Sequence, residues 1–518
     1  MELDNISESD LIKCREVLQA LVAERTLMSR INADERKALL MAAGQFSRPD
    51  RLEVMKIAKR HRRNRDKKKK DADRAARAET HIRKAREASV FVAPLQISGA
   101  IETPPPAGQV KLENPRACYV CKTEYQTLHF FYDSMCTPCG DLNYKKRFQT
   151  AGLDGRVALI TGSRVKIGFQ SALLLLRAGA RVIVTTRFPH DAASRFSREH
   201  DFKQWQSRLQ IFGLDLRHAP SVEIFCSYLN DTLDRLDYII NNAAQTVRRP
   251  PGFYDHMADL EAKPFSDLAP DLQSILAHYD RCKTVLESHY ALPTEPKESG
   301  KSEGWMTSWY GASGGLGIRA PALSARIPWV KEKETDNGLL FPEGRLDADL
   351  QQIDLRQMNS WRLKLADVPT PEMIEVQLVN SIAPFILNAK LKALMLRNRD
   401  NEKHIVNVSA MEGKFTRYTK TDKHPHTNMA KAALNMMTVT SAPDYAKDGI
   451  YMNAVDTGWV TDEDPIELSS AKQAEHDFHP PLDIVDGAAR ICDPIFMSVL
   501  TGEHVWGKFL KDYTFTTW

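Results

Sequence analysis

The sequence predicts an α/β protein with a doubly wound parallel sheet, preceded by a helical N-terminal region and a small cysteine-paired module. Two observations predict the sheet: short apolar runs alternate with helical patterns from Leu153 onward, and a glycine-containing loop follows the first run. Two C-x-x-C pairs predict the module. The expected parts are residues 1–92, a linker at 93–114, the module at 115–150 and the sheet domain at 151–518.

The N-terminal region is expected to be helical. Ser7 and Asp10 can form a capping box, and apolar residues then recur at helical spacing. Further helices are expected at residues 33–46 and from Pro49 into the basic run KRHRRNRDKKKK (59–70). This run could be a nuclear localisation signal or a phosphate-binding patch, but a solvated helix face is favoured because Ala- and Glu-rich sequence follows it. No aromatic residues are interleaved for base stacking, so nucleic acid is not expected as a partner.

Composition and targeting signals indicate a chain that neither crosses a membrane nor enters the secretory route. No run of eighteen apolar residues exists, so no membrane span is expected. The N-terminus has no basic start followed by an apolar core. The net charge of +4 favours no class of partner. A cytoplasmic or nuclear location is therefore expected.

The paired cysteines predict a metal site. Cys118, Cys121, Cys136 and Cys139 form two C-x-x-C pairs separated by fourteen residues, whereas the other four cysteines are scattered. Two such turns supply the four thiolates that zinc prefers, so we expect structural zinc in a zinc-ribbon-like module. A closed shell leaves no open position for catalysis. Redox activity of a C-x-x-C pair is the alternative, and His129 is a spare candidate ligand whose ordinary role would be packing.

The elements of the sheet domain follow in order. Residues 156–162 form a continuous apolar run, as expected of a parallel strand buried on both faces. From residue 246 to 370 the alternation stops, and we interpret this segment as an insertion, part ordered and part mobile. The other expected elements are a helix at 170–180, strands at 181–187, 208–216 and 236–244, a helix at 375–395, a strand at 404–410, a helix at 430–437 and a strand at 450–458.

The loop TGSRVKIG, from Thr161 to Gly168, lies between the first strand and its helix. It resembles the T-G-x-x-x-G-x-G loop of the short-chain dehydrogenase/reductase family, and the resemblance extends over residues 153–245 and 370–461. It implies a Rossmann sheet in which a dinucleotide pyrophosphate lies at the helix N-terminus. Lys166 stands where the family has its middle glycine.

The basic residues of this region indicate NADP(H). An NAD-selective site would place Asp or Glu at the end of the second strand to hold the ribose 2′-hydroxyl, and Arg187 stands there instead. Arg164 and Lys166 add positive charge, although they could also be solvated loop residues. The resemblance further implies that Asp215 contacts adenine. The expected cofactor-binding residues are Thr161, Gly162, Arg164, Lys166, Ile167, Gly168, Arg187, Asp215, Asn241, Ala243, Lys431 and Thr461.

The resemblance implies four catalytic groups, of which two are absent. Asn380 and Lys431 match the family asparagine and lysine. Thr427 stands four residues before Lys431, where the family has tyrosine, and an aliphatic hydroxyl does not titrate in the accessible range. Ala410 aligns with the family serine. Ser409, one residue earlier in the strand, should point away from the cofactor unless a bulge turns it.

A relocated proton donor would have to come from another side chain. His426 is adjacent to the threonine and titrates near neutral pH, whereas Glu412, Tyr418 and His424 are further candidates. The alternative is that all of these are ordinary loop residues. The catalytic candidates are therefore Asn380, Lys431, Thr427, Ser409 and His426.

The sequence predicts an NADP(H)-binding oxidoreductase of short-chain dehydrogenase type that acts on an unassigned carbonyl or alcohol with a non-standard proton donor. The alternative is a catalytically silent NADP(H) sensor or scaffold that binds a protein partner through the zinc module or the insertion. Both hypotheses leave a homo-oligomer open. Arg248 and Arg249, at the start of the insertion, could meet an anionic substrate or the cofactor phosphates, or could anchor the insertion by salt bridges.

Overall fold

The computed structural model describes residues 6–88, 90–91, 110–290, 315–327, 337–398, 400, 402–417 and 420–518. The chain forms two compact units, residues 1–73 and residues 74–518. The first contains α1 (Glu8–Ala23), a short 3-10 helix (Arg25–Arg30), α2 (Ala33–Ser47) and most of α3 (Arg51–Ala78). The expected N-terminal helices are confirmed, including the capping box of Ser7 with Asp10.

The basic run 59–70 lies within α3 and is exposed along nearly all of its length, as expected of a solvated helix face. Residues 93–109 of the expected linker lie outside the described residues, and β1 begins at Lys111. None of the helices in the described part of the chain is both long and apolar enough to cross a bilayer.

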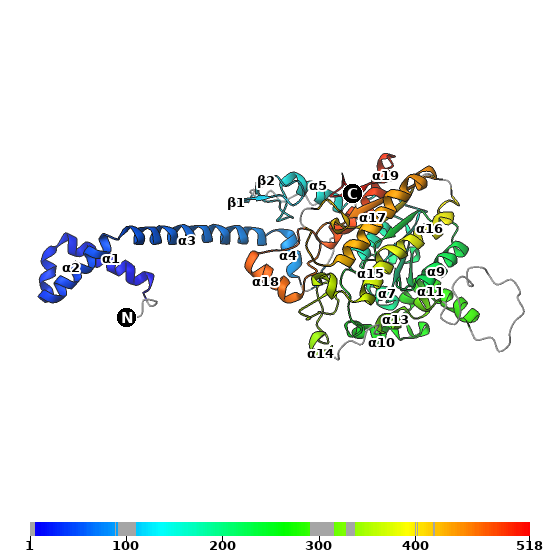
Figure 1. Ribbon diagram of the computed structural model, residues 1–518, viewed down its shortest axis with the longest axis horizontal. Coiled ribbons are helices and arrows are strands. Elements are labelled where there is room, and N and C mark those ends of the chain that lie inside the picture. The colour runs from blue at the N-terminus through cyan, green and yellow to red at the C-terminus, as the bar shows by residue number, and fades with distance from the viewer. Residues whose placement is uncertain are drawn as a thin grey trace, which may run out of the picture. The chain divides into compact units, whose positions relative to one another are not determined.

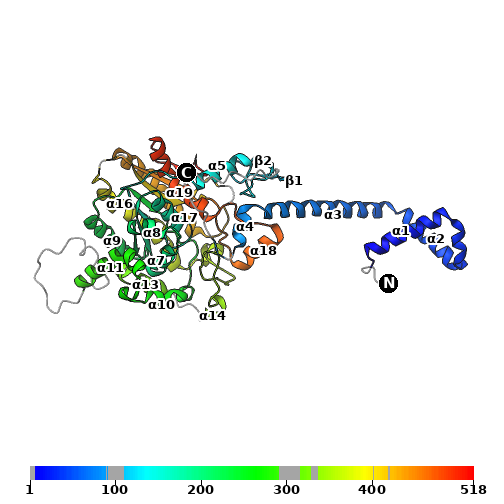
Figure 2. The same ribbon diagram turned by 180° about the vertical axis from the view of Figure 1, so that it is seen from behind.

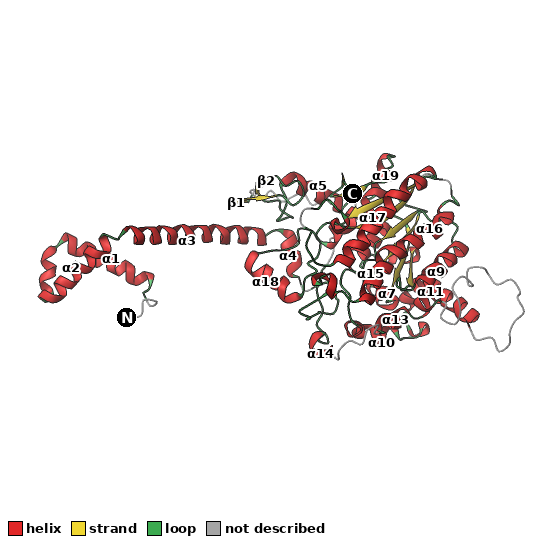
Figure 3. Cartoon of the chain, in the orientation of Figure 1, coloured by secondary structure: helices red, strands yellow, loops and turns green. Residues whose placement is uncertain are grey.

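The second unit is built on an eight-stranded sheet with the order β10-β9-β8-β7-β6-β3-β4-β5. Figures 1 and 3 show strands of this sheet between the helices of the unit. All neighbours pair in parallel except β10, which is antiparallel to β9. The strands are β3 (Val157–Thr161), β4 (Arg181–Thr186), β5 (Leu209–Gly213), β6 (Tyr238–Asn241), β7 (Lys403–Ser409), β8 (Ile450–Asp456), β9 (Phe509–Lys511) and β10 (Thr514–Thr516). The prediction of a doubly wound Rossmann sheet is confirmed.

Helices cover both faces of the sheet, as Figures 1 and 2 show from opposite sides. One layer holds α6 (Lys166–Arg177) beside α19 (Ile484–Thr501). The other holds α9 (Ala219–Thr232) beside α16 (Ala383–Met395), with α17 (Pro425–Lys447) against β8. The chain order reverses between β3 and β6, and ligands of such sheets bind outside the carboxyl ends of the strands at that point.

The expected helix at 375–395 is confirmed with one irregularity. It is a continuous segment of α15 (Thr370–Gln377), a π-helical turn (Leu378–Ile382) and α16. Single π turns inside helices are frequent at functional sites. This turn carries Asn380.

The insertion is folded where the structure describes it. Its longest helix, α11 (Pro270–Tyr290), packs on β5 at the sheet edge. A separate apolar cluster forms around Phe253, Tyr254 and Phe341. Residues 291–314 and 328–336, which include most of the Gly- and Ser-rich patch, lie outside the described residues. The remaining short helices are at Pro251–Met257, Ala258–Glu261, Phe265–Asp267, Leu316–Arg319, Pro321–Arg326, Asn337–Leu340, Ser360–Arg362 and Leu365–Asp367.

The cysteine module consists of the hairpin β1 (Lys111–Ala117) and β2 (Glu124–Thr127) followed by α5 (Thr137–Arg147). It packs on α19 through buried ion pairs. Arg147 Nη1 lies 2.7 Å from Asp483 Oδ1 and 2.9 Å from Asp486 Oδ1. Tyr132 donates a hydrogen bond of 2.5 Å to Asp486. The module is therefore fixed to the sheet domain. The helices α4 (His81–Glu87), α7 (Pro189–Ser197), α8 (Phe202–Trp205) and α18 (Ile466–His476) complete the unit.

Candidate functional site

A cavity of about 1340 Å³ opens at the carboxyl ends of the strands. Residues at or directly after the end of each strand from β3 to β8 line it, as expected for a ligand site of this sheet type. These lining residues are Gly162, Arg187, Asp215, Asn242, Ala410 and Asp456. The cavity therefore runs from the end of β5 across the crossover point to the end of β8.

The loop after β3 leaves room for a ligand next to its backbone. Gly162 has φ +70°, and a Cβ there would lie 2.8 Å from the Cα of Ala243. A Cβ on Gly168 would lie 2.3 Å from Asn242 Nδ2, which donates to the carbonyls of Thr161 and Gly162. No side chain caps the first turn of α6. Its N–H groups are therefore available to a phosphate, so this loop fits a dinucleotide pyrophosphate.

Lys166 occupies the position of the family's middle glycine in the left-handed conformation, with φ +56°. L-residues rarely adopt this conformation, which explains the family preference for glycine there. The side chain lines the cavity, and its Nζ lies 4.0 Å from Asp349 Oδ2. The ammonium of Lys166 thus extends from the loop toward Asp349 in the insertion.

The two arginines proposed for the cofactor differ in their partners. Arg164 is buried and forms a 2.7 Å ion pair with Asp191, which also pairs with Arg195. Arg187 donates a 2.8 Å hydrogen bond to the hydroxyl of Tyr254 and lies over its ring. Among the described residues no carboxylate pairs with Arg187. Its charge lowers the pKa of Asp215 without an ion pair, so Arg187 is the freer of the two arginines to meet a ligand.

Asp215 is held by the protein itself. Its carboxylate accepts hydrogen bonds from Arg217 and, at 2.9 Å, from Ser324 in the insertion. Burial raises the pKa of Asp215, but the hydrogen bonds and charge of Arg217 outweigh this effect and hold the pKa below its usual value. The insertion therefore reaches the end of the cavity where the sequence predicted adenine. The adenine contact itself stays a prediction.

Two further cofactor candidates, Thr161 and Asn241, have clear local roles. Thr161 Oγ1 accepts a hydrogen bond from the Ala243 N–H, which ties the loop after β3 to the end of β6. Asn241 Nδ2 donates to the side-chain oxygens of Asn388 and Asn407, both at 2.8 Å, and so joins β6 to its neighbours in the interior. Ile167, Ala243 and Thr461 line the cavity, whereas Thr161 and Asn241 stand behind its wall.

Lys431 lies at the cavity, whereas Asn380 lies outside its lining. Lys431 lines the cavity, and its Nζ donates a 2.7 Å hydrogen bond to the Val408 carbonyl. Burial lowers the pKa of Lys431 to about 8. Asn380 makes two hydrogen bonds to the backbone of Gln245, accepting at 2.6 Å and donating at 3.1 Å. It therefore fixes the start of the insertion and is not among the residues that line the cavity.

The structure does not bring Thr427 or His426 to the cavity. Thr427 is buried, and His426 Nε2 lies 3.5 Å from Glu372 on α15. Neither Thr427 nor His426 is among the residues that line the cavity. Ser409 lines the cavity and donates a 2.5 Å hydrogen bond to Asn435 on α17, so its hydroxyl is engaged by the protein. That the family's serine and tyrosine hydroxyls have no counterpart here stays a prediction.

The face of α17 that meets the cavity carries His424, Asn428 and Lys431. This i, i+4, i+7 spacing identifies one helix face and could have been read from the sequence. His424 has φ +41°, and its ring stacks on Trp361 with a centroid distance of 3.9 Å. Burial lowers the pKa of His424 to about 4, so the imidazole is neutral at physiological pH.

The other candidates are accounted for by local contacts. Glu412 lines the cavity and pairs with Arg417, and Tyr418 lies outside the described residues. Arg248 lies 3.4 Å from Glu375, and Arg249 pairs with Asp354. Both arginines therefore anchor the insertion by salt bridges, although Arg249 also lines the cavity.

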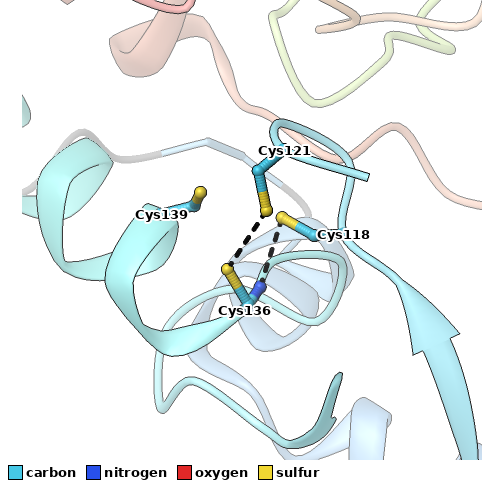
Figure 4. A group of neighbouring side chains, drawn as sticks. All are labelled: Cys118, Cys121, Cys136 and Cys139. Carbon is cyan, nitrogen blue, oxygen red and sulfur yellow. Dashed lines mark hydrogen bonds between the residues drawn. The ribbon is translucent and has the colours of Figure 1, made fainter. Parts of the chain in front are cut away.

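The four cysteines of the module converge, as Figure 4 shows. Their Sγ atoms all lie within 4.8 Å of one another, and Cys121 and Cys136 approach to 3.7 Å. A tetrahedral shell with zinc–sulfur bonds of about 2.3 Å places its sulfurs about 3.8 Å apart, so the cluster fits zinc closely. His129 lies outside the cluster, and its Nδ1 accepts hydrogen bonds from two backbone N–H groups. It therefore has the packing role.

Comparisons with known proteins show what the chain is similar to. Residues 156–262 match the family model of the short chain dehydrogenases. The chain is 28% identical over 439 residues to the uncharacterized protein R665 of Acanthamoeba polyphaga mimivirus, covering 82% of this chain and 81% of R665. It is 33% identical over 92 residues to the WW domain-containing oxidoreductase of Drosophila melanogaster, which is 18% of this chain and 22% of that protein. The solved Pseudomonas aeruginosa RhlG/NADP active-site complex aligns over 69% of this chain and 95% of its own, with 16% identity and a TM-score of 0.40.

Proposed function

Because this chain belongs to the short chain dehydrogenase family, we propose that it is an NADP(H)-dependent oxidoreductase acting on a carbonyl compound or the corresponding alcohol. The observation that carries the proposal is the continuous cavity between Arg187, whose charge has no carboxylate partner among the described residues, and Lys431. The uncapped first turn of α6 lies between them. This arrangement offers a cation for the 2′-phosphate, N–H groups for the pyrophosphate and an ammonium for the nicotinamide ribose.

The bound cofactor would supply or accept the hydride at the substrate carbon. The protein residues would then bind and orient the substrate and handle the proton. Lys431 would hold the ribose hydroxyls, because its Nζ donates only to Val408 O within the described structure. His424 would donate a hydrogen bond to the substrate oxygen as a neutral imidazole, because its buried Nδ1 has no protein partner. Solvent water would supply the proton to the substrate oxygen, because Thr427, which stands at the family tyrosine position, does not line the cavity.

Arg187→Ala tests the cofactor assignment. A charge-assisted hydrogen bond to phosphate contributes about 1.5–3 kcal/mol, so the variant should bind NADPH about 10- to 100-fold more weakly. NADH affinity should be unchanged, because NADH has no 2′-phosphate. Arg198→Ala, on an exposed arginine outside the cavity, is the matched control. Calorimetric titration of each protein with both coenzymes measures the effect, and an equal loss for NADPH and NADH would contradict the assignment.

Turnover is tested separately with a panel of aldehydes and ketones and NADPH. Wild-type reduction that disappears in Lys431→Ala supports the oxidoreductase. Tight NADPH binding with no turnover of any panel member would instead favour the silent sensor or scaffold. That alternative draws its support from the positions of Thr427 and His426 outside the cavity. A protein partner and a homo-oligomer stay predictions under both.

We also propose that the four-cysteine cluster holds a structural zinc ion. The proximity of the four sulfurs supports it, and the hydrogen bonds from Thr123 that lower the pKa of the Cys121 thiol to about 6 favour the thiolate form that zinc binds. Purified protein should contain one zinc per chain by elemental analysis. Cys121→Ser should lower that content, whereas Cys14→Ser, an exposed cysteine outside the cluster, should not. A metal-free protein with a Cys121–Cys136 or Cys118–Cys139 disulfide would contradict the zinc site.

A further inference from the structure

A second buried lysine faces the cavity near Lys431. Lys414 follows the short 3-10 helix Met411–Gly413 at the end of β7 and is 6% exposed. Its Nζ donates to two threonine hydroxyls near the C-terminus, Thr516 at 2.9 Å and Thr517 at 2.8 Å. Among the described residues no carboxylate pairs with Lys414. Neutral hydroxyls are therefore its only hydrogen-bond partners in the described structure.

A buried cation held only by neutral groups is expensive for the fold. Burial lowers the pKa of Lys414, the nearby charge of Lys511 lowers it further, and the carboxylate of Asp456 offsets part of this shift. Proteins normally pair such a charge with a carboxylate. Lys414 therefore lacks a carboxylate at ion-pair distance in the described structure, although Asp456 acts on it from farther away.

The carboxylates around Lys511 are already engaged by other cations. Asp456 and Asp512 lie 3.3 Å and 3.2 Å from Lys511 Nζ. Asp512 also pairs with Arg490 at 3.0 Å, and Asp456 accepts the Gly458 N–H. Among the described residues neither Lys414 nor Lys431 has a carboxylate at ion-pair distance, although Asp456 acts on both lysines and Glu412 on Lys431.

The 2′-phosphate of the cofactor does not account for this charge. The 2′-phosphate is expected at Arg187 after β4, and Lys414 follows β7, three positions away in the strand order. Adjacent strands lie about 4.8 Å apart, so the two strand ends are separated by about 14 Å. An anion at Lys414 would therefore belong to a different molecule or a different part of the ligand.

We propose that Lys414 binds an anionic group of the substrate, so that the enzyme acts on carbonyl compounds that carry a carboxylate or a phosphate. An ammonium has three donors, and the threonines take two of them, which leaves one for the substrate. The two hydroxyls orient that third N–H without neutralising the charge. The reaction assigned to this substrate rests on the proposed function, whereas the binding of the anion does not.

Matched probes test the subsite. 4-Carboxybenzaldehyde and its methyl ester differ in one charge, and their KM values are compared at saturating NADPH. Lys414→Met should raise the KM of the acid about 10- to 100-fold and leave that of the ester within about twofold. Lys414→Arg, which keeps the charge, should restore most of the loss. Lys390→Met, on an exposed lysine outside the cavity, is the control.

Binding without cofactor separates this proposal from the proposed function. Titrations with benzoate and with phenyl phosphate, followed by calorimetry, report the affinity of the two anions directly. Weaker binding of either anion to Lys414→Met supports the subsite even if no aldehyde is reduced, and the preferred anion identifies the substrate class. Equal affinity of wild type and Lys414→Met for both anions, with unchanged NADPH binding as the check on folding, would overturn the proposal. An equal rise in KM for acid and ester would do the same.

Discussion

The buried ammonium of Lys431 should destabilise the fold below pH 8, and Lys431→Met should reveal this cost. Burial lowers the pKa of Lys431 from 10.5 to about 8. This difference corresponds to about 3 kcal/mol of preference for the neutral form. Below pH 8 the lysine is charged in both the folded and the unfolded chain, so the folded state carries the full cost.

The sign of the pH dependence follows from the protons bound in each state. Between pH 8 and 10.5 the unfolded chain keeps the lysine proton and the folded chain releases it, so the free energy of unfolding rises with pH. Between pH 7 and 9.5 this contribution amounts to about 2 kcal/mol. Lys431→Met lacks the group, so its stability advantage over wild type should shrink by that amount. Leaving the Val408 carbonyl unpaired costs about 1–3 kcal/mol, but this cost does not depend on pH.

Urea denaturation of both proteins without cofactor, followed by tryptophan fluorescence at pH 7 and pH 9.5, measures the two free energies of unfolding. Lys390→Met provides the comparison, because that lysine is exposed and its loss should give a difference independent of pH. A stability difference between wild type and Lys431→Met that is the same at both pH values would refute the reasoning.

Two further predictions concern the loop and the module. Gly168→Ala places a Cβ 2.3 Å from Asn242 Nδ2 and 2.4 Å from the Gly162 carbonyl oxygen. The NADPH affinity, measured by titration, should therefore fall at least about tenfold, and the free energy of unfolding, measured by denaturation, by about 1–3 kcal/mol. Gly152→Ala, whose added Cβ would meet nothing within 4 Å, should change neither quantity. Arg147→Met leaves Asp483 and Asp486 without their buried cation, so it should cost about 3–5 kcal/mol and make the module the first site of limited proteolysis. An unchanged cleavage pattern would show that other contacts hold the module.

Most of the fold could be predicted from the sequence because its signals are local. The continuous apolar runs identify the parallel strands, and the glycine loop identifies the first crossover. The cap at Ser7 and the two cysteine pairs depend on residues close in the chain. The region after residue 461 carried no such signal, and its strands β9 and β10 emerged only with the sheet.

The sequence by itself determined the class of fold and the position of the glycine loop between the first strand and its helix. Only the tertiary structure decided which charges are available to a ligand. Arg164 and Arg187 look equivalent in the sequence, but Asp191 pairs with Arg164 and no described carboxylate pairs with Arg187. Lys414 meets its threonine partners across about a hundred residues of chain. A side chain's free charge depends on neighbours brought together by packing, and local sequence patterns do not encode those neighbours.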